Sequence, residues 1–360
     1  MRKHNMIPKK LAPAKAGVAD FSDKIMRKIK ENRERCRFNV VKKRANRMRS
    51  TQRRKVMFRR TRLCALALAA ALLPSNASAQ SCVGNPVAVQ ILGSGGPRIN
   101  PERASASYLL WVDARAKILV DIGGGAFFRF GQSRARLGDL SLLAISHLHP
   151  DHVSDLPALL WTSNQLRNDP LPIFGPSGND TAPDFSTFLR RLFDAKTGAF
   201  QVLGATLGTT PGNAGGGVRL EVGVVDVTKA EPSTVFDRDG VMVTALGIPH
   251  GPLPTLAYRV RTRGVSIVFS SDQTGTNPNF IDFAKGANVL IMHLAIAAGA
   301  TSPLHAAPAV VGRVAKDAGV GRLIVSHIGQ FDLDPAIAEL KKFYTGPLTV
   351  GADLQCTPVQ

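Results

Sequence analysis

The chain has 360 residues and a formal net charge of +20, with 46 lysines and arginines against 26 aspartates and glutamates. Residues 1–62 hold 23 of these basic residues and 4 of the acidic ones, so residues 63–360 are close to neutral. A surface that tracks a nucleic-acid backbone is therefore not expected on residues 63–360. Hydrophobic residues make up 44% of the chain, enough for a sizeable core, and no apolar run reaches the ~18 residues of a membrane span.

Residues 57–79 contain the three parts of a signal peptide in their usual order. A basic start over residues 59–62 precedes an apolar run over residues 63–73, and a small-residue cleavage motif ends at Ala79. We expect cleavage after Ala79, which would give a periplasmic or secreted mature chain over residues 80–360.

Residues 1–56 precede Met57, where this signal peptide would start. We interpret them as a basic extension that is either disordered or not translated. The alternative is a basic tail that binds nucleic acid or anionic lipid, which its charge fits.

Export would leave Cys82 and Cys356 as the cysteines of the mature chain. In an oxidising compartment they can join its two ends by a disulfide. Two free thiols are the alternative.

The rest of the chain alternates strand and helix patterns without a linker, which predicts a single α/β domain. Strands are expected at residues 87–92, 107–112, 117–120, 142–146, 172–174, 218–227, 241–246, 257–261, 265–270, 288–292 and 322–326. Helices are expected at residues 126–136, 152–166, 185–193 and 308–318. A Gly/Thr-rich loop is expected at residues 204–217.

Histidines carry the clearest chemical signal. Three of the eight lie within residues 147–152, where His147 and His149 end an expected strand and their imidazoles face one side. Asp151 and His152 follow a turn and can bind a second cation beside the first. Imidazole and carboxylate suit zinc, so the run predicts a site for two cations rather than a solvated loop.

This run, His-x-His-x-Asp-His, resembles the hallmark of the metallo-β-lactamase superfamily. Six further segments resemble its ribonuclease Z-like branch, which also holds zinc phosphodiesterases and some arylsulfatases. They are residues 91–97, 119–123, 173–176, 249–260, 269–274 and 324–328. The resemblance spans about residues 87–354 and implies a four-layer αββα sandwich.

The resemblance also implies the metal ligands. They are His147, His149 and His250 for a first zinc ion, Asp151, His152 and His327 for a second, and Asp272 as a bridge between the two. Manganese or iron in place of zinc stays open.

Three further polar residues follow expected strands or precede an expected helix. Asp121 either orients a ligand histidine or caps the turn after its strand. The resemblance implies that His293 donates a proton to the leaving oxygen, although Leu294 stands where the branch often has Glu. His305 either lines the site or begins a helix.

We therefore expect an exported dizinc hydrolase in which a metal-bridging hydroxide attacks a small phosphodiester or aryl sulfate ester. The oligomeric state stays open, with a homodimer as one option. The first alternative is a ribonuclease Z-like endoribonuclease with a functional basic arm, although only 22 residues separate His250 from Asp272, where some ribonucleases Z carry a tRNA-gripping arm. A β-lactam, lactone or thioester hydrolase is the other alternative.

Overall fold

The computed structural model describes residues 82–162, 167, 169–208 and 218–360. The expected basic extension, the expected signal peptide and most of the expected loop at residues 204–217 lie outside the described residues. Among the described residues, no helix combines the length and the apolar character needed to cross a membrane.

The first sheet has seven strands. In spatial order they are β14 (Cys356–Pro358), β1 (Val87–Gly93), β2 (Ser107–Val112), β3 (Arg115–Val120), β4 (Leu142–Ala144), β5 (Leu171–Pro176) and β6 (Leu220–Val225). Neighbours pair antiparallel from β14 to β3 and parallel from β3 to β6.

The second sheet also has seven strands. In spatial order they are β13 (Leu348–Val350), β12 (Arg322–Ser326), β11 (Val289–His293), β10 (Val265–Phe269), β9 (Thr255–Thr262), β8 (Val241–Ile248) and β7 (Ser233–Arg238). Neighbours pair parallel from β13 to β10 and antiparallel from β10 to β7.

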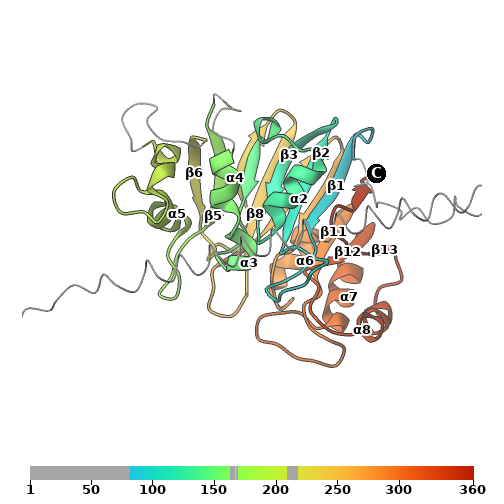
Figure 1. Cartoon of the computed structure of the whole chain (residues 1–360). Coiled ribbons are helices and arrows are strands. Elements are labelled where there is room, and N and C mark those ends of the chain that lie inside the picture. Colours follow the sequence, from blue (N-terminus) through green and yellow to red (C-terminus); the bar gives the residue numbers. More distant parts are fainter. Residues whose placement is uncertain (1–81, 163–166, 168, 209–217) are drawn as a thin grey trace, which may run out of the picture. The chain divides into compact units, whose positions relative to one another are not determined.

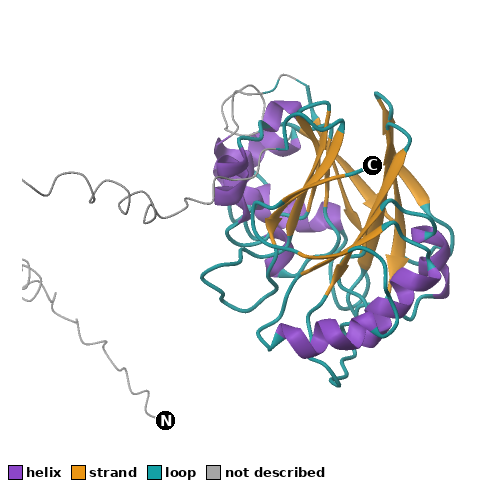
Figure 2. Ribbon diagram, turned by 90° about the vertical axis from the view of Figure 1, so that its right-hand side faces the viewer, coloured by secondary structure: helices purple, strands orange, loops and turns teal. Residues whose placement is uncertain are grey.

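Helices cover the outer face of each sheet (Figures 1 and 2). Those on the first sheet are α2 (Ala126–Ser133), α4 (Leu156–Thr162) and α5 (Phe185–Phe193), and those on the second are α6 (Pro278–Ala284), α7 (Pro308–Asp317) and α8 (Leu333–Lys341). The short elements are α3 (Pro150–Val153), η2 (Leu137–Asp139) and η3 (Gln201–Leu207). The predicted four-layer αββα sandwich is confirmed.

Three apolar clusters hold these layers together, and strand β2 contributes side chains to two of them. Leu109 and Trp111 pack toward the helices, whereas Tyr108, Leu110 and Val112 pack between the two sheets. Successive side chains of a strand point to opposite faces, so a strand buried on both faces loses the usual alternation of apolar and polar residues.

The predicted helix at residues 152–166 is wrong in its first part, and its last part, residues 163–166, lies outside the described residues. The structure has the short helix α3, a break, and then α4, which starts at Leu156. Pro157 lacks an amide hydrogen and therefore favours the first turn of a helix rather than its middle. The break is anchored because the Asp155 carboxylate accepts a hydrogen bond from the amide of Phe127, and the Asp155 amide donates to the carbonyl of Ile122.

Helices α6 and α8 and strands β7, β13 and β14 were not predicted. Both helices carry a start signal in the sequence: the side chains of Asn277 and Asp332 each accept a hydrogen bond from a backbone amide of the first turn. Pro278 then occupies the start of α6. The strands β13 and β14 have only three residues each, too few for a periodic pattern.

The C-terminal segment is fastened to the first sheet. Cys82 and Cys356 are joined by a disulfide. The nearby Asp353 carboxylate accepts hydrogen bonds from the amide and hydroxyl of Ser94, the amide of Ala104 and the side chain of Arg129. These bonds hold the loop that follows β1. The carbonyl of Ser94 in turn accepts a hydrogen bond from the amide of Ile328, the residue after His327.

Candidate metal centre

The site lies where strands of both sheets end. Residues 146–152 follow β4 of the first sheet, and His250, Asp272 and His327 follow β8, β10 and β12 of the second. His293 is the last residue of β11. Because polar groups at these strand ends converge at one edge of the sandwich, residues more than a hundred positions apart in the sequence share one site.

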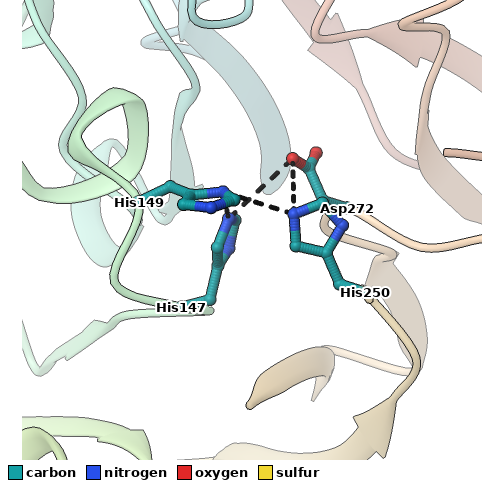
Figure 3. Close-up of side chains that lie close together, drawn as sticks. All are labelled: His147, His149, His250 and Asp272. Atoms are coloured by element: carbon teal, nitrogen blue, oxygen red, sulfur yellow. Dashed lines mark hydrogen bonds and ion pairs between the residues drawn. The ribbon is translucent and has the colours of Figure 1, made fainter. Parts of the chain in front are cut away.

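The first cluster, defined as His147, His149, His250 and Asp272, has ligand atoms that all lie within 4.8 Å of one another (Figure 3). His149 Nδ1 is 3.1 Å from His147 Nε2 and 3.3 Å from His250 Nε2. Asp272 Oδ2 is 3.8 Å from His147 Nε2 and 3.6 Å from His250 Nε2. Two ligands of a tetrahedral zinc ion, each bonded at about 2.0–2.1 Å, lie roughly 3.3 Å apart, which these spacings match.

The second cluster is Asp151, His152 and His327, whose ligand atoms also lie within 4.8 Å. Asp151 Oδ2 is 3.1 Å from His327 Nε2 and 3.7 Å from His152 Nε2. Asp272 Oδ2 is 3.7 Å from His152 Nε2, and Asp272 Oδ1 is 3.3 Å from His327 Nε2. The carboxylate of Asp272 therefore borders both clusters, so the structure brings together all seven residues that the sequence singled out as ligands.

Backbone and side-chain acceptors orient two of the histidines. His250 Nδ1 is 2.9 Å from the carbonyl of Leu304, so Nδ1 carries the hydrogen and Nε2 is left for a metal. His152 Nδ1 is 2.8 Å from Asp121 Oδ2, and the amide and hydroxyl of Ser146 also donate to the Asp121 carboxylate. Of the two interpretations of Asp121, this contact supports the one in which it orients a ligand histidine.

The clusters fit divalent metal ions. His152 Nε2 is buried, faces Asp151 and Asp272, and has no hydrogen-bond partner among the described residues. An unpartnered buried nitrogen is costly unless something else satisfies it, and a metal ion does so. The donor set of imidazole nitrogens and carboxylate oxygens suits zinc and also iron or manganese.

Burial and neighbouring charges set the protonation of the site. Burial and the neighbouring His152 hold the pKa of His147 well below its ordinary value, so this imidazole stays neutral, as a metal ligand must. Burial raises the pKa of Asp272, but the imidazoles of His327 and His152 outweigh it and hold this pKa well below its ordinary value. Asp272 is therefore ionised at neutral pH.

His293 and His305 differ in their surroundings. Both ring nitrogens of His293 are engaged, Nδ1 by Asp272 Oδ1 at 2.5 Å and Nε2 by the Tyr108 hydroxyl at 3.0 Å, and its side chain is only 4% exposed. The His305 side chain is 17% exposed, and its Nδ1 lies 3.9 Å from Asp272 Oδ2 without a hydrogen-bond partner in the described part of the chain.

Sequence reasoning missed Tyr108, Ser146 and Ser326 as parts of this site. Ser146 contacts Asp121, and Tyr108 contacts His293 and Ser326. Tyr108 lies within β2, Ser326 ends β12, and Ser146 follows β4. A hydroxyl at such a position is only a weak signal in the sequence, because it also suits a buried structural residue.

Comparison with known proteins agrees with this geometry. A family model described as "Beta-lactamase superfamily domain" matches residues 116–328, more than half of the chain. The chain belongs to the metallo-β-lactamase superfamily. A ribonuclease Z of Mycolicibacterium paratuberculosis is 31% identical over 290 residues, which are 74% of this chain and 96% of the relative. A ribonuclease Z of Mycobacterium bovis is 28% identical over 288 residues, with the same coverage. These matches confirm the expected ribonuclease Z-like branch.

Solved structures share the fold of this superfamily member. The short form of human tRNase Z is 20% identical, with a TM-score of 0.58, and the match covers 76% of this chain and 99% of that one. The metallo-β-lactamase fold protein YhfI from Bacillus subtilis is 22% identical, with a TM-score of 0.57 and the same coverage. The chain is thus a metal-dependent hydrolase by family.

Acidification should destabilise the metal-free protein. Burial lowers the pKa of His293 to about 3 and that of His305 to about 4, whereas an imidazole in the unfolded chain titrates near 6.5. As the pH falls from about 6.5 to about 5, the unfolded state therefore takes up protons that the folded state does not, and the free energy of unfolding decreases. The pKa of His152 is raised, so His152 is protonated in the folded state throughout this range and does not reverse the trend.

Urea unfolding of protein stripped of metal with EDTA, at several pH values between 5 and 7, measures this effect. A free energy of unfolding that stays constant or rises on acidification would contradict the burial of these two histidines.

Proposed function

We propose that the chain is a phosphodiesterase whose centre holds two zinc ions. The observation that carries this proposal is the position of Asp272, whose carboxylate borders both clusters. Two metal ions that share a carboxylate lie close enough to act on one phosphoryl group. When bound, such a metal pair supplies the nucleophile and the Lewis acid for in-line displacement at phosphorus.

The substrate we propose first is an RNA phosphodiester. The relatives named ribonuclease Z support this alternative over the small phosphodiester or aryl sulfate expected from the sequence. A small phosphodiester is the second candidate, supported by residues 294–307. This segment follows β11 and includes His305, and it contains no lysine, arginine, aspartate or glutamate. A surface that grips a long nucleic acid needs cations, which this segment does not supply.

The protein's own residues have separate tasks in the proposed reaction. The pKa values of Asp151 and Asp272 are lowered, so both carboxylates are ionised at neutral pH and would balance the charge of bound metal ions. We assign the proton donation to His305, because its side chain is the more exposed of the two histidines outside the clusters and its buried Nδ1 has no hydrogen-bond partner among the described residues. An anionic phosphodiester beside His305 would raise its pKa and favour the protonated form.

The substrate class can be measured directly with the zinc-loaded protein and Asp151→Ala as the blank. We predict cleavage of single-stranded RNA and of bis(4-nitrophenyl) phosphate, at least about 100-fold slower in Asp151→Ala, because the second cluster loses a ligand. Cleavage of 4-nitrophenyl sulfate should be much slower. A preference for the sulfate ester, or equal rates in the blank, would contradict the proposal.

The role of His305 has its own kinetic signature. We predict that His305→Ala lowers kcat on RNA by about 100-fold or more, because the 5′- or 3′-oxygen that leaves needs a proton. The same substitution should change hydrolysis of bis(4-nitrophenyl) phosphate far less, since nitrophenolate leaves without help. Equal loss on both substrates would contradict proton donation by His305.

We infer that residues 57–79 direct export. The disulfide between Cys82 and Cys356 supports export, because structural disulfides persist in oxidising compartments. N-terminal sequencing of the native protein should find Gln80 first, in the periplasmic or secreted fraction. A protein that begins at Met1 inside the cell would contradict export, and its basic residues 1–62 would then be available to bind RNA.

A further inference from the structure

A chain of hydrogen bonds crosses between the two sheets and ends on Asp272. The Tyr108 hydroxyl, on β2 of the first sheet, lies 3.0 Å from His293 Nε2 and 3.1 Å from Ser326 Oγ. His293 and Ser326 are paired neighbours on β11 and β12 of the second sheet. His293 Nδ1 then contacts Asp272 Oδ1 at 2.5 Å. Each of these four residues is at most 5% exposed, so water does not compete for these bonds.

The chemistry of the partners fixes which ring nitrogen of His293 carries the hydrogen toward Asp272. An ionised carboxylate only accepts hydrogen bonds, so His293 Nδ1 is the donor. Nε2 is buried and needs a partner of its own, and the Tyr108 hydroxyl is that partner. Tyr108 therefore holds the imidazole plane in the one orientation that brings Nδ1 to Asp272.

The two oxygens of Asp272 consequently have different neighbours. Oδ1 receives the hydrogen bond of His293 and lies 3.3 Å from His327 Nε2. Oδ2 lies 3.6–3.8 Å from the Nε2 atoms of His147, His250 and His152, which come from both clusters. The terminal torsion of an aspartate is broad, so an unrestrained carboxylate would rotate and lose this arrangement.

We propose that Tyr108 and His293 are positioning residues that lock the rotation of the Asp272 carboxylate, so that Oδ2 faces both metal clusters. His293 then acts through Asp272 and has no ring nitrogen left for a leaving oxygen. The proposal rests on the metal centre of the proposed function but not on the identity of its substrate.

The test compares two tyrosines that are buried alike. Tyr258 is fully buried, and its hydroxyl donates to the carbonyl of Ile145 at 2.8 Å, so Tyr258→Phe also removes one buried hydrogen bond. Zinc affinity is measured for the full chain by competition with a chromogenic chelator. We predict that Tyr108→Phe weakens zinc binding about 10-fold or more, in the range seen for residues that orient metal ligands, and that Tyr258→Phe changes it much less. Equal zinc affinity in the two variants would overturn the proposal.

A second pair of variants tests His293 itself. The amide of His293→Asn can replace the Nδ1 donor, whereas His293→Ala has no donor, so Asn should retain zinc affinity that Ala loses. Equal zinc affinity in the two variants overturns positioning. So does unchanged zinc affinity with a rate that falls only on RNA, which would be the signature of a proton donor. Zinc affinity is measured without substrate. The comparison of the variants therefore still tests positioning if the protein does not hydrolyse phosphodiesters.

Discussion

One buried carboxylate, that of Asp272, contacts histidines of both clusters in the candidate metal centre. Asp272 is 2% exposed, and a charge buried so deeply is tolerated only when it is paired and hydrogen bonded. Imidazoles from both sheets surround it, and their effect on its pKa outweighs that of burial. The same carboxylate lies beside imidazoles of both clusters, so the contacts that make Asp272 tolerable in the core also bring the two clusters together.

The two-sheet sandwich brings the histidines that surround Asp272 together. Strands of two sheets end at one edge, and the loops that follow them carry the histidines and aspartates. The central strands bury mainly apolar side chains, both against the helices and between the sheets, whereas the buried histidines and aspartates of the site gather at or beyond the strand ends. The Asp353 carboxylate also supports the site. It accepts hydrogen bonds from the amides of Ser94 and Ala104, and the loop after β1 that they belong to contacts the strand end that carries His327.

Four of the seven ligands could be predicted from the sequence because they stand in one short, chemically distinctive run, whereas His250, Asp272 and His327 were implied by the family resemblance. The run at residues 147–152 places three imidazoles and a carboxylate within six positions, and few structural roles require that. Tyr108 could not be predicted in the same way, since a single tyrosine in an apolar strand also suits a hydrophobic core. Its role depends on Ser326 and His293, which only the pairing of β11 and β12 brings together. The helix predicted at residues 152–166 misses the break before Leu156, because the periodic leucines are a stronger pattern than the single Pro157.

Family membership explains the chemistry better than it explains the substrate. One fold can host many activities, so membership of the superfamily does not fix the substrate, and substrate-binding residues commonly lie on loops such as residues 294–307, which include His305. That loop is uncharged here, while the chain's excess positive charge lies in residues 1–62. The candidate site therefore lies in the nearly neutral part of the chain, and the basic part is residues 1–62. If residues 1–62 are absent from the mature protein, their positive charge is not available to bind nucleic acid.

A crystal structure of the zinc-loaded protein, with anomalous data at the zinc edge, would show whether the Asp272 carboxylate joins two metal sites. We predict two anomalous peaks, one among His147, His149 and His250 and one beside His152 and His327, with Asp272 between them. A single peak, or a peak away from Asp272, would contradict it.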